Sequence, residues 1–326
     1  MITDTSLAFA KINISLDIVS KMANGYHNLK MVMQTVGLSD EITIESAKDP
    51  TGEKDPTGAK NPTGAKSPSG AKNFADTPRE MISIDAGAPY LPDDERNLAA
   101  KAAFAFFAHT GITGYHTKIK IKKRIPVSAG LGGGSADAAC VLRMLNKMHK
   151  TGLDRRALEK LGETVGSDVP FCIAGGTRLA EGRGEILTDL PAIPKSHIVI
   201  CKPPFSCSTP ELFARVNCEK IHARPDTDGL IKALGEADIG GVARRMYNVF
   251  EDILPRGRSD VDEIKSILLD NMALGAVMTG SGPAVFGLFD SETNAKNAYV
   301  CLKENYQECY LTETVSGNGN TASDNG

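Results

Sequence analysis

A glycine-rich loop at residues 126–139 carries the strongest chemical signal in this sequence, which there reads PVSAGLGGGSADAA. An expected strand at 115–125 precedes the loop, and an alanine-rich expected helix follows it at once. Glycines allow a backbone to approach a ligand closely and to turn its amides toward it. The start of a helix adds unpaired N–H groups and the positive end of the helix dipole. The sequence therefore predicts an anion site, usually for phosphate, and hence a nucleotide-binding loop.

Two common phosphate-loop patterns do not fit this segment. A Walker A loop ends in Gly-Lys-Ser or Gly-Lys-Thr, and no Gly-Lys pair occurs in the chain. The dinucleotide pattern requires a third glycine where Ser135 stands. A tight strand-to-helix turn without a ligand is the alternative, although three consecutive glycines are unusual in a mere turn.

Two charged residues outside the loop are candidates for catalysis. Lys11 and Asn13 stand two positions apart on an expected strand at 7–18, so their side chains leave the same face. A lysine among apolar neighbours is costly unless it meets an anion, although an exposed edge-strand lysine is the alternative. Asp168 stands between Gly166 and an apolar stretch, where its carboxylate would be partly desolvated; a local turn or cap hydrogen bond is the alternative there.

Several segments together resemble the motifs of the GHMP kinases, a family of small-molecule kinases. They are AFAKINISL at 8–16, GYH at 25–27, the loop at 126–139, GSDVPF at 166–171, AEGRGE at 180–185 and MTGSGPAVF at 278–286. The resemblance covers roughly residues 6–310, apart from one insertion.

The resemblance implies an α+β fold of two domains. The N-terminal domain, at 1–179, would bind ATP and resemble the second domain of ribosomal protein S5, with a low-complexity insertion at 48–78. The C-terminal domain, at 180–315, would be ferredoxin-like, and 316–326 would form a disordered tail.

The resemblance also implies an ATP-dependent phosphoryl transfer to an alcohol, with Mg²⁺ as the second cofactor. Lys11 and Asp168 would be catalytic, with no protein ligand assigned to the metal; we expect Asp137 to favour the helix start rather than to hold Mg²⁺. The residues expected to bind the nucleotide are Asn97, Lys123, Pro126, Gly130, Leu131, Gly132, Gly133, Gly134 and Ser135. Those expected to bind the acceptor are Asn13, Tyr26, His27, Phe205, Thr279, Gly280 and Ser281.

The expected acceptor carries a cytidine diphosphate group, again as the resemblance implies. An aromatic pair such as Tyr26 and Phe205 can sandwich a pyrimidine, and His27 can recognise its hydrogen-bonding edge. Phe205 is nearly as well explained by packing alone. Two alternatives stay open: a kinase for another alcohol, such as homoserine or a mevalonate-like compound, and a nucleotide-binding module without catalysis. The presence of both Lys11 and Asp168 argues against the latter.

Bulk properties narrow the class of partner. The net charge of −3 argues against nucleic acid, and no run of about 18 apolar residues predicts a membrane span. The seven cysteines include no C-x-x-C pair, and the N-terminus lacks a signal pattern, so we expect reduced cysteines and a cytoplasmic location. The expected assembly is a monomer or weak homodimer, although no sequence pattern determines it. Four hexapeptides at 49–72, each with Pro and Gly in type I turn positions, predict a solvated loop.

Hydrophobic periodicity predicts the remaining elements. Strands are expected at 7–18, 31–38, 41–45, 81–84, 115–125, 177–179, 197–201, 276–279 and 284–289. Helices are expected at 97–110, after the glycine loop to about 148, and at 155–165, 209–216, 229–234, 239–250 and 260–271.

Overall fold

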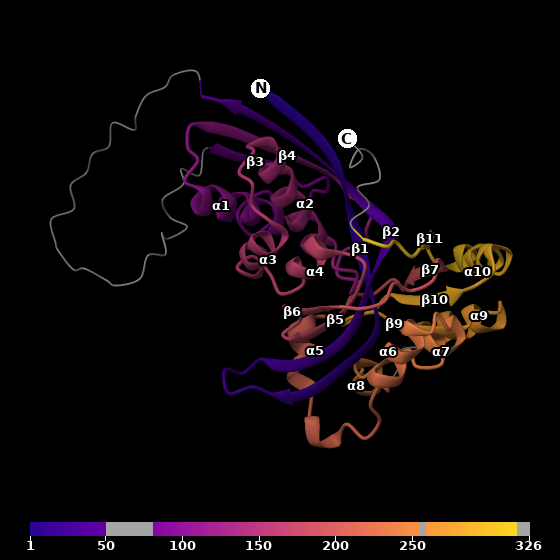
Figure 1. The fold of residues 1–326 in the computed structure, drawn as a ribbon. Coiled ribbons are helices and arrows are strands. Elements are labelled where there is room, and N and C mark those ends of the chain that lie inside the picture. Colours follow the sequence, from indigo (N-terminus) through magenta and orange to yellow (C-terminus); the bar gives the residue numbers. More distant parts are fainter. Residues whose placement is uncertain (50–80, 255–258, 318–326) are drawn as a thin grey trace.

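The computed structural model describes residues 1–49, 81–254 and 259–317. Two β-sheets, each with its own helices, make up these residues (Figure 1). The predicted insertion at 48–78 and the predicted tail at 316–326 lie almost entirely outside the described residues, so both stay predictions.

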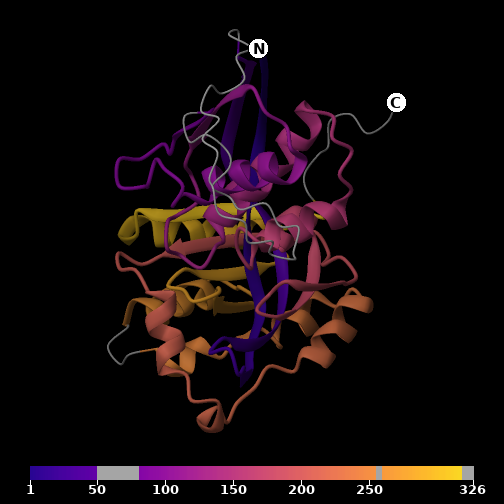
Figure 2. The same cartoon turned by 90° about the vertical axis from the view of Figure 1, so that its left-hand side faces the viewer.

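The first sheet is built on two long antiparallel strands, β1 (Ile2–Lys21) and β2 (His27–Lys48). Figure 2 shows them running from the half of the molecule that holds α1 to α4 into the other half. The sheet order is β3-β4-β2-β1-β8, and β5 pairs with the other end of β2 and also with β6. These strands span Ile82–Asp85 (β3), Tyr115–Lys122 (β4), Thr177–Gly182 (β5), Ile186–Asp189 (β6) and Tyr247–Asn248 (β8).

Four helices lie together on one side of the long strand pair (Figure 1). They are α1 (Leu98–Thr110), α2 (Gly133–Met148), α3 (Arg155–Glu163) and α4 (Val169–Ala174). The alternation of β4 explains the packing: Ile119 and Ile121 are buried toward the helices, while the lysines between them are exposed. Alanines in α1 and α2 allow these two helices to pack closely on one another and on the sheet.

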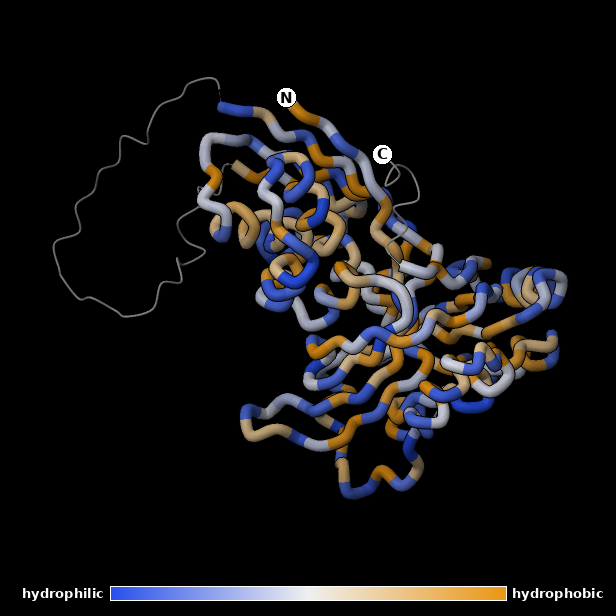
Figure 3. Tube along the Cα trace, in the orientation of Figure 1, coloured by the Kyte–Doolittle hydropathy of each residue, from blue (hydrophilic) through white to orange (hydrophobic). Residues whose placement is uncertain are grey.

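The second sheet is antiparallel, in the order β11-β7-β10-β9. Its strands are β7 (His197–Lys202), β9 (Gly275–Met278), β10 (Val285–Phe289) and β11 (Glu308–Glu313). Figure 3 shows that hydrophobic residues are concentrated in the interior of this half. Every residue of β10 is buried. The helices are α5 (Thr209–Arg215), α6 (Thr227–Gly235), α7 (Ile239–Ala243), α8 (Phe250–Ile253), α9 (Ser259–Asp270) and α10 (Glu292–Asn305), with a 3₁₀ turn η3 (Cys218–Lys220).

Several expected elements differ from the structure. The helix expected at 239–250 is wrong: α7 ends at Ala243, and β8 then pairs in parallel with Ser15 and Leu16 of β1. Tertiary pairing thus overrides the helical periodicity of this segment. The two strands expected at 31–38 and 41–45 are one strand, β2. Sequence periodicity did not reveal α10 or β11.

The first sheet continues past the predicted domain boundary at residue 179. β5 crosses that boundary and β6 extends the same sheet to Asp189. The two sheets are linked where the amide of Val315 donates to the carbonyl of Thr35, beside a bridge between Val36 and Thr314. The two halves therefore share a continuous backbone network at this edge.

Candidate active site

A cavity of about 1450 Å³ lies between the glycine loop, the β1–β2 pair and the N-terminus of α5. It is large enough for two substrates, because drug-sized ligand pockets typically occupy about 300–1,000 Å³. The two expected catalytic residues, Lys11 and Asp168, line it together with the whole loop from Pro126 to Ser135.

The glycine loop leaves its amides open toward this cavity. Gly130 and Gly132 have φ angles of 78° and 68°, a left-handed conformation that glycine adopts without strain. Gly132 also forms the N-cap of α2, where it supplies no side-chain oxygen to the first helical amides. Those amides and the positive end of the helix dipole therefore remain available to an anion.

Lys11 and Asp168 face one another although 157 positions separate them in the sequence. Lys11 is only 4% exposed, and its Nζ lies 3.5 Å from Asp168 Oδ2 while it donates to Asn13 Oδ1 at 2.7 Å. The register of β1 shifts between Phe9 and Lys11, and the Lys11 amide donates to Leu131 O of the glycine loop at 3.0 Å. This irregularity ties the strand to the loop beside the lysine.

Asp168 precedes α4 without making a side-chain capping bond, and its side chain is 30% exposed. The capping alternative is therefore not what the structure shows. The carboxylate instead lies at the cavity wall with the Lys11 ammonium as its ion-pair partner.

A second glycine turn, from the end of β9, closes this part of the cavity. Thr279 is fully buried; its Oγ1 accepts from the Asn13 amide at 3.0 Å and donates to Gly130 O at 3.3 Å. Gly280 and Ser281 line the cavity, whereas Thr279 lies behind its wall. The three segments therefore meet at one threonine side chain.

The aromatic end of the cavity differs from the sequence expectation in one residue. Tyr26 and His27 line it, but Phe205 does not; Phe213 of α5 stands there instead, stacked on His27 with ring centroids 5.1 Å apart. Phe205 packs against the hydrophobic core, so its expected place at the base is not supported by its position. A helical phenylalanine that fits ordinary packing gave no signal that would separate it from core residues.

Two polar side chains, His27 and Arg183, lie at this end of the cavity. His27 is 8% exposed, and its Nε2 is one of the few buried side-chain atoms without a hydrogen-bond partner among the described residues. Burial, and then the nearby charge of Lys21, lowers the pKa of His27, so the ring is neutral near pH 7. The guanidinium of Arg183 lies 5.5 Å from the centre of the Tyr26 ring, over one of its faces.

Asn97, expected to bind the nucleotide, uses its side chain for two hydrogen bonds within the protein. Its Oδ1 accepts from the Ala99 amide and caps α1, while its Nδ2 donates to Pro92 O at 3.0 Å. It lines the cavity as a structural residue of the wall.

Lys123, expected at the phosphates, is held by two buried carboxylates. Its Nζ lies 2.5 Å from Asp40 Oδ2 and 2.8 Å from Asp137 Oδ2. Burial acts to lower the pKa of Lys123, but the attractions of Asp137 and Asp40 together outweigh it, so the pKa is raised. Burial raises the pKa of Asp137 to about 7, with Lys123 opposing the shift and Asp40 adding to it.

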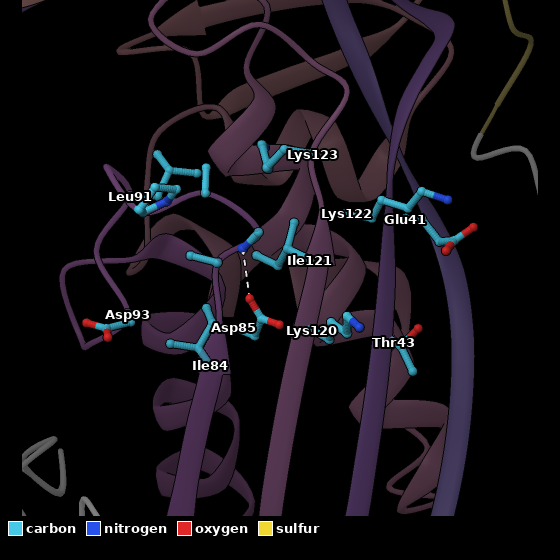
Figure 4. Close-up of a pocket in the computed structure, with 14 residues that line it drawn as sticks. Glu41, Thr43, Ile84, Asp85, Leu91, Asp93, Lys120, Ile121, Lys122 and Lys123 are labelled. Carbon is cyan, nitrogen blue, oxygen red and sulfur yellow. Dashed lines mark hydrogen bonds between the residues drawn. The ribbon is translucent and has the colours of Figure 1, made fainter.

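A second cavity, of about 1050 Å³, lies on the other side of Lys123 (Figure 4). Its wall carries Glu41 opposite Lys122 and Asp85 opposite Lys120, in register across neighbouring strands. Because these charges alternate in sign, they balance locally. Lys123 is the charged residue that lines both cavities.

Comparison with known proteins places the chain in a family. Residues 97–176 match the GHMP kinases N terminal domain and residues 230–308 match the GHMP kinases C terminal model. The chain is 40% identical over 308 residues to a 4-diphosphocytidyl-2-C-methyl-D-erythritol kinase of Acetivibrio thermocellus, covering 94% of this chain and 98% of that protein. It is 38% identical over 310 residues to the kinase of that name from Clostridium botulinum (strain Loch Maree / Type A3), covering 95% and 99%. The chain therefore belongs to the GHMP kinase family, and within it to the 4-diphosphocytidyl-2-C-methyl-D-erythritol kinases.

Solved structures agree with this assignment. A crystal structure of 4-(cytidine 5'-diphospho)-2C-methyl-D-erythritol kinase has a TM-score of 0.74 at 27% identity and covers 96% of this chain and 100% of that one. Homoserine kinase from Cytophaga hutchinsonii has a TM-score of 0.69 at 18% identity, covering 97% and 95%, and at that identity it shows the fold alone. The prediction of a two-domain GHMP kinase fold is confirmed, while the bounds 1–179 and 180–315 stay predictions. No helix within the described residues is both long and apolar enough to cross a membrane.

Proposed function

We propose that this protein transfers the γ-phosphoryl group of ATP to the 2-hydroxyl group of 4-diphosphocytidyl-2-C-methyl-D-erythritol, in the non-mevalonate route to isoprenoid precursors. One observation carries the proposal beyond the family assignment. A single cavity joins the open amides of the glycine loop, the Lys11–Asp168 pair and the aromatic end at Tyr26 and His27. These are the three parts that a kinase with a pyrimidine-bearing acceptor requires.

Asp168 is proposed to accept or orient the proton of the acceptor hydroxyl, and Lys11 to stabilise the charge that passes between the two substrates. Phosphoryl transfer leaves the protein little covalent work beyond alignment, charge stabilisation and exclusion of water. Lys11 suits this role because Asn13 and the carboxylate hold its ammonium group in a buried position. The same ammonium holds the Asp168 carboxylate at the cavity wall, where it can meet a hydroxyl group of the acceptor.

The loop from Gly130 to Ser135 is proposed to bind the ATP phosphates through its amides and the serine hydroxyl. Among the described residues, no group of three or more His, Cys, Asp or Glu could hold a metal ion by itself. A metal carried mainly by the nucleotide fits this site, since Mg²⁺ in kinases is held largely through substrate phosphates. Mg²⁺ would supply charge neutralisation on those phosphates.

The acceptor base is proposed to lie against the face of Tyr26 that Arg183 leaves open. Tyr26 is 57% exposed, and Arg183 covers one face of its ring, which leaves surface for a base on the other. Neutral His27 has one ring nitrogen that donates and one that accepts, and its unpartnered Nε2 can pair with the edge of a pyrimidine. A buried polar atom without a partner is costly, and a bound base would remove that cost.

The direct test is ADP release from ATP and Mg²⁺ with three acceptors: 4-diphosphocytidyl-2-C-methyl-D-erythritol, homoserine and mevalonate. We expect release with the cytidyl compound alone. Release of ADP with homoserine or mevalonate instead would support kinase activity and contradict the proposed binding site for the pyrimidine base. Silence with all three, in protein that binds ATP, would favour a binding module without catalysis.

A matched pair of variants then tests the proposed base. Asp168→Asn should lower turnover by orders of magnitude while ATP still binds. Asp154 stands at the equivalent place before α3, where it caps the helix, and asparagine caps almost as well. Asp154→Asn should therefore keep its activity. Unchanged turnover in Asp168→Asn would remove Asp168 from the mechanism.

A further inference from the structure

The buried cluster of Asp40, Lys123 and Asp137 has an unbalanced charge. The side chains are 0%, 11% and 4% exposed, so solvent screens them little. With all three ionised, two carboxylates face one ammonium, which leaves one net negative charge. That charge lies under the loop proposed to bind the phosphates of ATP, because the Lys123 ammonium is within 3.4 Å of a Cβ built at Gly133.

The two carboxylates differ in how firmly the fold holds them. Asp40 Oδ1 accepts from the amides of Arg124 and Ile125, at 2.5 and 2.9 Å, while its Oδ2 holds Lys123. Asp137 Oδ2 accepts from Lys123, and within the described part of the chain its buried Oδ1 has no hydrogen-bond partner. Asp40 is therefore the firmly held carboxyl group of the cluster, and Asp137 is the one whose contacts can change.

Few other ionisable groups face Asp137. Cys140 stands one turn further along α2 and Cys172 comes from α4; burial raises the pKa of both thiols, so they remain neutral. Lys11 of β1 packs against Gly132, but its ammonium is paired with Asp168. Lys123 is thus the cation on which the charge balance of Asp137 depends.

We propose that nucleotide binding is coupled to the uptake of one proton by Asp137. The phosphates draw the Lys123 ammonium away from Asp137 Oδ2, and the carboxylate left behind takes a proton from solvent to become a neutral acid. Asp40 keeps its contact with Lys123 and its two backbone donors throughout. This inference rests on the proposed binding of ATP at the loop.

Two physical reasons favour a protonated Asp137 over an ionised Asp137 that has lost its contact with Lys123. A buried carboxylate that loses its cation faces both Asp40 and the incoming phosphates, and such an uncompensated charge is strongly unfavourable. The pKa of Asp137 is about 7 before any nucleotide is bound, so protonation near neutral pH requires little work. Two carboxyl groups close together commonly share a single proton for the same reason.

The test is calorimetric titration of the full-length protein with the magnesium complex of a non-hydrolysable ATP analogue. Titrations in three buffers of different ionisation enthalpy give the number of protons taken up, and they are repeated at pH 6, 7 and 8. Subtracting the Asp137→Asn value removes proton exchange by the ligand itself. We expect the difference to approach one proton at pH 8 and to fall toward zero at pH 6, where Asp137 is already protonated.

Controls separate the inference from folding and from the proposed function. Asp4→Asn removes a half-buried carboxylate on β1 that pairs with the exposed Lys147, and it should behave as the wild type. Equal proton uptake by the wild type and Asp137→Asn at pH 8 would overturn the inference and leave ATP binding intact. A second result would also overturn the inference: Asp137→Asn loses its magnesium-dependent affinity for the analogue but takes up as many protons as the wild type. Asp137 would then be assigned to binding the metal ion.

Two further outcomes are also decisive. If Asp137→Asn does not fold, the wild-type buffer series still decides, since uptake that does not rise from pH 6 to pH 8 contradicts the inference. If the wild type does not bind the analogue at all, the proposed ATP site itself fails. That result is recognisable because no titration heat appears in any buffer.

Discussion

Replacing Gly130 with alanine tests whether the close approach of the two glycine turns is needed for catalysis. A Cβ at this position would lie 2.1 Å from Thr279 O and 2.9 Å from Gly282 N, both backbone atoms. Ordinary contacts begin near 3.4 Å, so the difference from 2.1 Å would force the turns apart by roughly 1 Å. A misplacement of about 1 Å in an active site can cost about 100-fold in rate.

Gly152 provides a control for backbone strain. Its φ of 69° resembles the 78° of Gly130, but nothing lies within 4 Å of a Cβ built there. Gly152→Ala should therefore lose only the cost of a left-handed alanine, about 1–2 kcal/mol, while Gly130→Ala should lose that amount plus the cost of displacing the turn. Only Gly130→Ala should lose activity in addition.

The assay is ADP release at saturating ATP and acceptor, combined with thermal unfolding of each variant. We expect turnover about 100-fold below wild type for Gly130→Ala and near wild type for Gly152→Ala. Turnover of Gly130→Ala within twofold of Gly152→Ala would show that the apposed turns are not part of the catalytic geometry. The reasoning from Thr279 to the active site would then be refuted.

Two further predictions follow from the aromatic end and from the buried cluster. Phe213→Leu should raise the KM for the acceptor up to about tenfold, since an aromatic pair contributes about 0.5–1.5 kcal/mol. Phe205→Leu should leave this KM unchanged. The reverse result would support the expected contact of Phe205 with the base. Because the pKa of Asp137 is raised from 3.8 to about 7, its stabilising contribution is complete below pH 4 and is lost as pH rises through 7. Asp137→Asn should therefore gain stability relative to wild type between pH 5 and pH 8 in urea unfolding, and a constant difference would contradict the raised pKa.

Local signals predicted the glycine loop because its chemistry is contained in consecutive residues. The positive φ angles of Gly130 and Gly132 and the helix that begins at Gly133 are properties of one short segment. Lys11 and Asp168 are different, since only the resemblance to a family joined positions so far apart in the chain. Their contact depends on β1 and on the start of α4, which packing brings together.

The failures lie where long-range packing decides. Tyr247 and Asn248 have a helical pattern around them, yet pairing with β1 makes them a strand. Asn248 then donates to the carbonyls of Met278 and Gly280, and no local sequence pattern predicts these hydrogen bonds. Asp40 was not predicted as a site residue for the same reason, because its backbone partners lie more than 80 positions away in the sequence.

Thr279 shows how the two sheets contribute to one site. It comes from the end of β9 in the second sheet, and its hydroxyl connects the Asn13 amide of the first sheet with Gly130 O of the loop. Asn248 holds the same turn through the carbonyls on either side of Thr279. Because these atoms are buried and hydrogen-bonded, any change in the packing of the second sheet against β1 must displace the loop or break the network. Asn248, which does not line the cavity, therefore helps to fix the position of Thr279 and, through it, of Asn13 and the glycine loop.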